Sequence, residues 1–384
     1  MTSSPHPSDK PIPVTRVITW LPVGGIERRL VSVLPRLADK GFAPRLLCIR
    51  EEGPLAQELR DAGVPVDLIA LRTRLDPFGI RRMAAALRTH GTRVLHSHMY
   101  RSNVPGTLAG RLARVPVVFG QVHNVGTWET PRQRAMDRFL CRWRTGMICV
   151  SRAVQRDVRD NLGLPEDATP VLYNGCDTDR FRPDEALRAA TRDALGIAPG
   201  QLAALVPARL HSQKNPLHTA EAFARALGHL GASSATPVLL FAGGGPMEDA
   251  LRDRVAQLGL AENVRLLGKR DDMTALYNAA DVMVLSTAKE GFSNAVVEAL
   301  ACGKPVIAAD VGGNAEALTP EVGWLHEAGD TEALASQLAE AFAGPEALAR
   351  RAAACRDRGL RFSLDRLVEE TAALYRRALD AAGE

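Results

Sequence analysis

Glu290 and Glu298 stand eight positions apart in the stretch EGFSNAVVE. The first follows an apolar run in a glycine-containing loop, and the second falls about one and a half turns into a helix expected to begin near Ser293. This spacing separates the two carboxylates by roughly 10 Å. That is too far for one acid–base pair, but it suits two grips on an extended ligand. Taken singly, Glu290 is better explained as an acidic partner of the helix dipole and Glu298 as part of a solvated face.

The residues between the two glutamates are Gly291, Phe292, Ser293 and Asn294. They lie at the predicted start of the helix, where backbone N–H groups lack an intrahelical partner and bind anionic oxygens. The stretch therefore predicts an anion-binding helix N-terminus between two ligand-binding carboxylates.

Alternating strands and helices are expected to position these residues. Residues 14–20 form a short β-rich run, LPVGG follows, and a helix is expected from Ile26 to about Lys40. The alternation continues through PRLLCIR, a helix, RVLHSHM, a helix from about Asn103, PVVFGQVH and GMICVS. This order predicts a doubly wound, Rossmann-like domain.

A second domain of the same kind is expected after residues 172–185, LYNGCDTDRFRPDE, where Asn-Gly, Asp and Pro turn signals interrupt the alternation. Strand-like LAALVPA, TPVLLFA, NVRLLG, DVMVLS and KPVIAA then alternate with helices. A last helix over about residues 364–379 is expected to cross back to the first domain. The predicted fold class is α/β, with two Rossmann-like domains facing each other across a ligand-binding cleft.

Length and composition agree with this division. A chain of 384 residues exceeds the usual size of a single core, and 46% hydrophobic with 24% charged residues is a globular composition. We predict a disordered tail at residues 1–13, a first domain at 14–175 joined by 363–384, and a second domain at 176–362. The polar, proline-rich opening resembles no signal peptide, and no apolar stretch approaches the ~20 residues that cross a bilayer. Six scattered cysteines without a CxxC pair indicate reduced thiols and a cytoplasmic protein.

The charge is uneven along the chain. Residues 1–190 hold 29 Lys and Arg against 19 Asp and Glu, whereas the remainder holds 19 against 25. A basic first half attracts an anionic surface or acceptor, or else its arginines only decorate a solvated face.

Five stretches together resemble family 4 retaining glycosyltransferases, which have the GT-B fold and are also called glycosyl transferases group 1. Residues 290–298 resemble the family's EX7E signature, ARLHSQKN its donor diphosphate motif, and FAGGGPM its glycine turn. VRLLGKRDDM resembles its base-binding loop, and YNGCDTDRF its interdomain linker. The resemblance covers nearly the whole second domain and thins out in the first.

The resemblance implies roles for residues of the second domain, which would bind the nucleotide-sugar donor. Arg209 and Lys214 would stabilise the negative charge that grows on the departing phosphate. Glu298 would hold the ribose hydroxyls, and Glu290 with the backbone of Phe292 to Asn294 would hold the sugar hydroxyls, with Gly291 as a further donor-binding residue. The further donor-binding residues are Gly243 in the turn and Lys269, Arg270 and Met273 at the base.

The first domain, which would bind the acceptor, contributes fewer pieces. Gly24 and Gly25 resemble the family's first loop, whose backbone closes over the donor phosphate; a plain tight turn is the alternative. His123 ends a strand where the family has a histidine near the reacting sugar, so we predict it to be catalytic, with Glu290, Arg209 and Lys214. His98, at the end of RVLHSHM, is the second candidate.

We expect no metal and no cofactor. The sequence has no DxD-type cluster and no Cys/His ligand spacing, and Asp271-Asp272 is predicted to cap the following helix. Arg209, Lys214 and backbone N–H groups would replace the cation. GGGPM lacks the GxGxxG spacing of a nicotinamide site.

A basic amphipathic segment, PRQRAMDRFLCRWRTG, places arginines 134, 138 and 142 on one stripe and Met136, Phe139, Leu140 and Trp143 largely on another. Such a helix lies on an anionic membrane, or else packs on its own sheet with a solvated basic face. Arginines 72, 74, 81 and 82 add to the basic surface. Peripheral contact at the inner membrane face is therefore an open hypothesis.

The predicted function is transfer of a sugar from a UDP- or GDP-linked donor to a hydroxyl acceptor, with retention. The expected acceptor is a lipid-linked or cell-surface glycan precursor of polysaccharide biosynthesis, and we expect no nucleic-acid partner. The alternatives are a nucleotide-sugar epimerase, a glycogen-synthase-like enzyme and a non-catalytic sugar-nucleotide-binding protein. A nicotinamide dehydrogenase is a more distant one.

Overall fold

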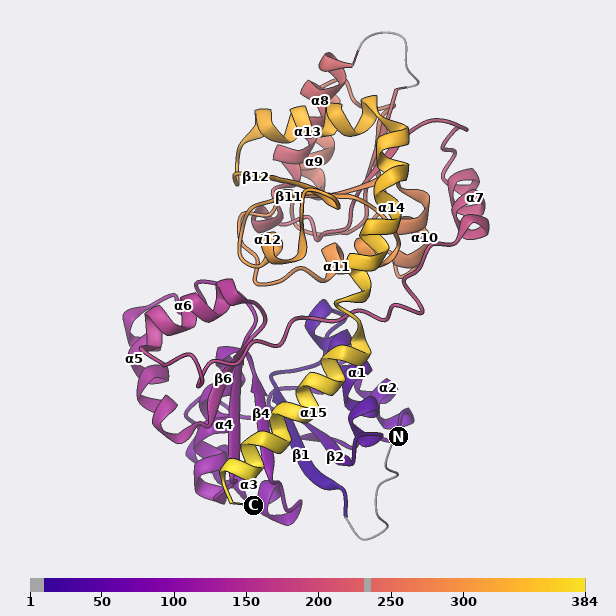
Figure 1. Ribbon diagram of the computed structural model, residues 1–384. Helices are drawn as coiled ribbons and strands as arrows, with labels where there is room; N and C mark the ends of the chain where they lie inside the picture. The colour runs from indigo at the N-terminus through magenta and orange to yellow at the C-terminus, as the bar shows by residue number, and fades with distance from the viewer. Residues whose placement is uncertain (1–9, 231–235, 384) are drawn as a thin grey trace. The chain divides into compact units, whose positions relative to one another are not determined.

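The computed structural model describes residues 10–230 and 236–383. Two compact units divide the chain: the second takes residues Asn174–Ser363, and the first takes the chain on either side (Figure 1). Of the predicted tail, residues 1–9 lie outside the described residues. Ile12 and Pro13 instead begin the first strand, a correction explained by pairing, because the N–H of Ile12 donates to the carbonyl of Gly41 at 2.9 Å.

The first unit is built on a parallel sheet, which over the described residues has six strands. In spatial order they are β3 (Val66–Leu68), β2 (Phe42–Cys48), β1 (Ile12–Ile18), β4 (Val94–His98), β5 (Val117–Val122) and β6 (Gly146–Cys149). Every residue of β4 and β5 is buried, as expected of a sheet covered on both faces. The chain runs outward from β1 in one direction and from β4 in the other, so the topological switch lies between these two strands.

The second unit repeats this plan. Its sheet, within the described part of the chain, has the order β12 (Gly323–His326), β11 (Val306–Ala309), β10 (Val282–Leu285), β7 (Ala203–Val206), β8 (Val238–Phe241) and β9 (Val264–Leu266). The switch lies between β7 and β10, which pair in parallel. The predicted α/β class with two Rossmann-like domains is confirmed.

Helices cover these sheets. Those of the first unit are α1 (Gly25–Ala38), α2 (Ala56–Asp61), α3 (Pro77–Thr89), α4 (Met99–Ala113), α5 (Pro131–Leu140), the 3-10 turn η1 (Cys141–Trp143), α6 (Arg152–Leu162) and α15 (Leu364–Ala381). Those of the second unit are α7 (Glu185–Ala194), the 3-10 turn η2 (Ser212–Lys214), α8 (Pro216–His229), α9 (Glu248–Gln257), α10 (Met273–Ala279), α11 (Asn294–Ala301), α12 (Asn314–Ala317), α13 (Thr331–Ala343) and α14 (Pro345–Leu360). No helix among the described residues is both long and apolar enough to span a bilayer.

Some of these elements were not anticipated from the sequence. They include β3, α3, α7 and the segment from β12 to α14. A strand as short as β3 leaves almost no periodic signal. Helix α4 begins at Met99 rather than near Asn103, because the chain enters it directly from β4.

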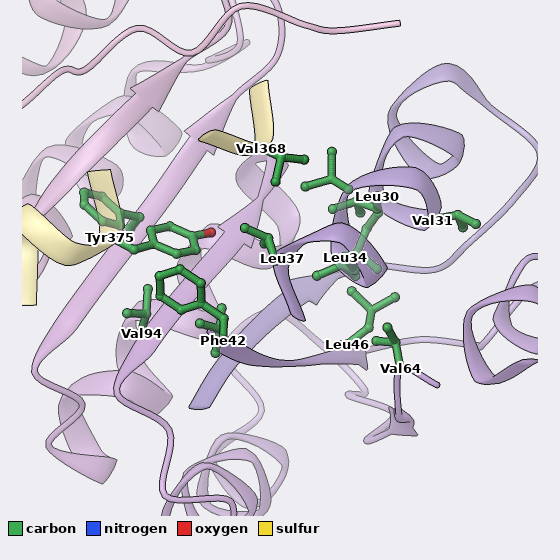
Figure 2. Close-up of a cluster of buried hydrophobic side chains, with 14 of the residues drawn as sticks. Leu30, Val31, Leu34, Leu37, Phe42, Leu46, Val64, Val94, Val368 and Tyr375 are labelled. Carbon is green, nitrogen blue, oxygen red and sulfur yellow. The ribbon is translucent and has the colours of Figure 1, made fainter. Parts of the chain in front are cut away.

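The last helix belongs to the core of the first unit, as predicted. Tyr375 of α15 is fully buried, with its ring edge-on to Phe42 at 5.7 Å and stacked on Phe119 at 6.2 Å. Figure 2 shows Tyr375 beside Phe42 and Val94, in the same buried cluster as the aliphatic side chains of α1. Burying a tyrosine of this kind contributes on the order of 2 kcal/mol, which ties the end of the chain to the unit that holds its beginning.

A buried ion pair fixes the basic helix α5. Asp137 and Arg144 approach to 2.6 Å with side chains only 1% exposed. Trp128 donates a hydrogen bond to the same carboxylate at 2.9 Å, and Arg144 donates to Thr107 of α4 at 2.7 Å. Because Asp137 and Leu140 face inward, the arginines of the predicted stripe are turned outward and are exposed.

Candidate functional site

Two predicted site residues meet at the switch point of the second sheet. Lys214 lies in the segment after β7, and Glu290 lies in the loop after the neighbouring strand β10. The Nζ atom of Lys214 donates to Oε2 of Glu290 at 2.5 Å, and the two side chains are 20% and 16% exposed. Partial burial strengthens this ion pair relative to a surface pair.

Backbone contacts hold the two loops together independently of the ion pair. Gln213 donates from Nε2 to the carbonyl of Lys289 at 2.8 Å, and its own carbonyl accepts from Ala288 N–H at 2.8 Å. The hydroxyl of Thr287 donates to the carbonyl of Gln213 at 3.0 Å. The backbone positions of Lys214 and Glu290 are therefore set by neighbours whose roles were not predicted.

The glycine turn after β8 packs against the segment that carries Arg209. A Cβ added at Gly243 would lie 2.0 Å from the carbonyl oxygen of Ala208, so only glycine fits there. On the other side of Arg209, the N–H of Leu210 donates to the carbonyl of Gly244 at 3.0 Å. The Arg209 side chain is exposed and makes no hydrogen bond or ion pair with the part of the chain that the structure describes. It remains available to an anionic ligand.

Gly312 supports the Glu290 loop from the other side and was not predicted. It has a left-handed backbone with φ of 57°, and a Cβ there would lie 1.8 Å from the carbonyl oxygen of Glu290. The next residue, Gly313, donates its N–H to the carbonyl of Gly291 at 2.8 Å. The sequence signal was the glycine pair two residues after the apolar run VIAA.

The predicted anion-binding stretch lies where α11 begins, at Asn294. Ser293 precedes the helix without capping it through its side chain. Phe292 is buried, with its ring 5.2 Å from that of Phe362, and its carbonyl accepts from Asn174 at 2.8 Å. The phenyl ring thus belongs to the core, and what residues 291–294 offer a ligand is backbone.

Glu298 is the fifth residue of α11 and is partly buried. Tyr277 of α10 donates its hydroxyl to Oε2 of Glu298 at 3.0 Å. Burial raises the pKa of Glu298 to about 7, against the smaller lowering effects of this hydrogen bond and of Arg180. The carboxylate is therefore only partly ionised at neutral pH in the ligand-free protein.

The residues predicted to meet the base follow β9. Lys269 is exposed, whereas Arg270 forms a two-point ion pair with Asp272 through contacts of 2.7 and 2.5 Å. Asp272 stands at the N-cap position of α10, but its side chain does not cap the helix, contrary to the prediction, because Arg270 engages both carboxylate oxygens. Met273 begins α10, the helix whose Tyr277 contacts Glu298, so this segment and Glu298 are structurally linked.

The first-unit residues surround the switch point of their own sheet. Gly24 and Gly25 stand where α1 begins, after β1, and a Cβ at Gly24 would lie 2.4 Å from the carboxylate of Glu27. His98 ends β4 and His123 directly follows β5. Their ring nitrogens are 3.2 Å apart.

Within residues 10–230 and 236–383, the structure brings together no group of three or more His, Cys, Asp or Glu side chains able to hold a metal ion.

Two family models together match most of the chain. The model described as Glycosyltransferase Family 4 matches residues 23–180, and the model described as Glycosyl transferases group 1 matches residues 188–358. The D-inositol 3-phosphate glycosyltransferase of Saccharomonospora viridis is 31% identical over 307 residues, which make up 75% of this chain and 70% of that protein.

The chain belongs to the group 1, family 4 glycosyltransferases.

Two further likenesses agree with this membership. The UDP-Gal:alpha-D-GlcNAc-diphosphoundecaprenol alpha-1,3-galactosyltransferase of Escherichia coli is 26% identical over 305 residues, 76% of this chain and 78% of that protein. The structure of HepE from Anabaena in complex with UDP superposes with a TM-score of 0.82 at 21% identity, covering 94% of this chain and 99% of that one. The fold of this glycosyltransferase is therefore GT-B.

Glu298 gives the glycosyltransferase a pH-dependent stability that Glu298→Gln should remove. The folded pKa, about 7, lies above the ordinary 4.5, so the free energy of unfolding falls as pH rises from about 4.5 through 7. At pH 8 we expect the variant to be more stable by up to about 3 kcal/mol, and at pH 4 to match the parent. Denaturant unfolding at both pH values measures this. Glu340→Gln, an exposed change on α13, should show no such pH dependence; an equal stability gain there would refute the assignment to Glu298.

Gly312→Ala should inactivate the glycosyltransferase although residue 312 has no reactive group. The added methyl would displace the Glu290 carbonyl, and a shift of about 1 Å near reacting atoms costs about a hundredfold in rate. Gly329→Ala is the matched control, because it has the same left-handed backbone with φ of 87° but open space around it. Its turnover should be unchanged. Circular dichroism and initial rates of sugar transfer compare the two, and equal rates would contradict the role given to Gly312.

Proposed function

We propose that this chain transfers a hexose from a UDP- or GDP-linked donor to a hydroxyl acceptor, with retention of the anomeric configuration. The observation that carries the proposal is the 2.5 Å contact between Lys214 and Glu290 beside the exposed Arg209, at the switch point of the second sheet. Arg209 and Lys214 supply cations for a diphosphate there, and Glu290 supplies a carboxylate for sugar hydroxyls. The HepE structures in complex with UDP and with UDP-glucose support a nucleotide-sugar ligand.

Arg209 and Lys214 act on the leaving group. As the bond between the sugar and the diphosphate breaks, negative charge grows on the phosphate oxygen, and preorganised cations stabilise it. Lys214 is paired with Glu290 before the donor binds. When the donor binds, the ammonium group of Lys214 also interacts with the phosphate oxygens. No cofactor or metal ion is part of the proposed reaction, because these side chains supply its positive charge.

Glu290 and Glu298 position the donor. Glu290 accepts hydrogen bonds from sugar hydroxyls, while Glu298 accepts them from the ribose and is steadied by Tyr277. Hydrogen bonds to ionised carboxylates are stronger than neutral ones, so ribose binding should favour the ionised form of Glu298. The segment from Lys269 to Met273 contacts the base.

Retention is proposed to follow a front-face route. The C1–O bond to the phosphate breaks, the acceptor oxygen bonds to C1 on the same face, and the acceptor proton passes to the leaving phosphate oxygen. The carboxylate of Glu290 is already paired with an ammonium group, which makes it a poor covalent nucleophile. His123 is proposed to lie near the reacting sugar.

Transfer should depend on Lys214 and not on a lysine in a similar pair elsewhere. With a panel of UDP- and GDP-hexoses and excess EDTA, Lys214→Ala should lower kcat about a hundredfold or more. Lys40→Ala is the control, because Lys40 also pairs with a glutamate, Glu369, but lies at the opposite, amino edge of the first sheet.

Proton NMR of the product's anomeric centre tests retention, and an inverted linkage would overturn it. A product formed without acceptor would instead indicate an epimerase. Donor binding without turnover in any condition would indicate a non-catalytic protein.

The acceptor is proposed to be a lipid-linked glycan precursor presented at the cytoplasmic face of a membrane. The name of the E. coli relative, which acts on a diphosphoundecaprenol-linked sugar, supports this class. Two exposed basic and apolar clusters on the first unit suit an anionic bilayer. One holds Phe139, 45% exposed, with Arg142 over its ring at 3.8 Å; the other holds Leu75 and Phe78, 52% and 72% exposed, near Arg74.

Membrane contact should therefore need Phe78 and Phe139, one from each cluster. The double variant Phe78→Ser/Phe139→Ser should lose most co-sedimentation with phosphatidylglycerol vesicles at low salt, and added salt should weaken binding of the parent protein. Leu112→Ser is the control, because Leu112 is 49% exposed at the far end of α4. No binding by the parent protein, or equal loss in the control, would exclude the proposed surface.

A further inference from the structure

Three side chains form a hydrogen-bonded chain at the switch point of the first sheet. Arg29 of α1 contacts Nδ1 of His123 through Nη2 at 3.1 Å, and Nε2 of His123 contacts Nδ1 of His98 at 3.2 Å. Arg29 and His98 are 9% and 1% exposed, whereas His123 is partly exposed. The contacts run from α1 to the end of β5 and on to the end of β4.

The chemistry of arginine gives this chain a direction. A guanidinium group only donates hydrogen bonds, so Nδ1 of His123 must accept and carries no proton. The neutral ring then carries its proton on Nε2 and donates it to Nδ1 of His98. By the same reasoning, His98 carries its own proton on Nε2. Burial is the main cause that lowers the pKa of both histidines well below the usual value, which keeps both rings neutral.

The hydrogen-bonded chain ends at an N–H donor that has no partner among the described residues. The Nε2 atom of His98 is buried and has no hydrogen-bond partner within the described ranges. Leaving a buried donor unpaired costs free energy, which a bound ligand would recover. The following residue, Met99, has a φ of 66°, a left-handed conformation rare for a residue with a side chain. Such backbone strain persists where the surrounding structure imposes it, and it clusters at ligand sites.

The charges around His98 favour an anion. Arg16 and Arg29 are both buried, and Nε of the first and Nη1 of the second also lack partners among residues 10–230 and 236–383. Burial lowers the pKa of Arg29 to about 10, still well above neutrality, and the carboxylate of Glu27 offsets part of its charge. The unpaired atoms of these three side chains are thus all donors, which match phosphate oxygens.

We propose that Arg29 is a positioning residue that fixes the tautomers of His123 and His98, so that Nε2–H of His98 donates a hydrogen bond to a phosphate oxygen of the substrate. The tautomer assignment is independent of the proposed function. The statement that the phosphate belongs to the substrate rests on the proposed function. Both ring nitrogens of His123 are already engaged by protein side chains. His98, the second candidate in the sequence, therefore takes the direct contact.

The tautomers are measured on the full-length protein labelled with nitrogen-15 histidine. Long-range proton–nitrogen spectra distinguish the two neutral forms, and single His→Gln variants assign His98 and His123 among the nine histidines. Both should show the proton on Nε2. A proton on Nδ1 of either ring in the parent protein would overturn the proposal without any variant.

Arg29→Met should change the ring resonances of His123 and also those of His98, to which Arg29 donates no hydrogen bond in the described part of the chain. Arg28→Met, the neighbouring but exposed arginine of α1, should change neither. Circular dichroism identifies a variant that fails to fold. Unchanged His98 resonances in a folded Arg29→Met protein would refute the relay.

Two ligands separate the sources of the phosphate. UDP represents the donor, and geranyl diphosphate represents a lipid-linked acceptor. At least one should shift the Nε2–H resonance of His98 in the parent protein and bind about tenfold more weakly to His98→Gln. If neither moves that resonance, the phosphate contact is excluded. If one does and no sugar is transferred from any donor, the proposed function fails while this site stands.

Discussion

Parallel pairing of β7 with β10 is the constraint on which the proposed donor site depends. These strands lie far apart in sequence, and the order of the sheet reverses between them. Their carboxyl ends therefore open side by side, and the loops that follow carry Lys214 and Glu290 to within 2.5 Å of each other. The same reversal between β1 and β4 brings the first glycine loop and His98 to one edge of the other sheet. In each of the two sheets, the reversal of strand order thus brings two loops that are distant in sequence to the same edge.

Charged groups at both edges are kept in unfavourable surroundings by their neighbours. Glu298 is buried enough for its pKa to reach about 7, and Arg29 enough for its pKa to fall to about 10. The charged form of each group would have a lower free energy in water. Groups whose pKa values are shifted by burial are typical of ligand sites, and each sheet has one near its switch point. The ion pair of Lys214 with Glu290 fits this view, since it stores two charges that a polar ligand can engage.

Two glycines fix the backbone geometry of the proposed donor site. Gly243 and Gly312 let two loops pass within contact distance of the carbonyls of Ala208 and Glu290, where any side chain would collide. The backbone beside Arg209 and Glu290 is thereby braced from behind. Gly243 was predicted as part of the site, but only as a turn in a family motif. Gly312 was not predicted, because a glycine pair after a strand does not reveal which backbone it will touch.

The sequence by itself determined the α/β class, the two Rossmann-like domains, the return of the last helix and the family. These depend on local periodicity, on turn residues and on motif spacing, all of which lie along the chain. Short or weakly periodic elements such as β3 escaped, as did the true start of the first strand at Ile12. Only the tertiary structure decided that Arg270 engages Asp272, that Tyr277 reaches Glu298, and that Arg29, His123 and His98 form one directed chain. Apart from the contact between Arg270 and Asp272, which are two positions apart, these contacts join residues from different elements. Their geometry is set by packing, which no spacing along the chain records.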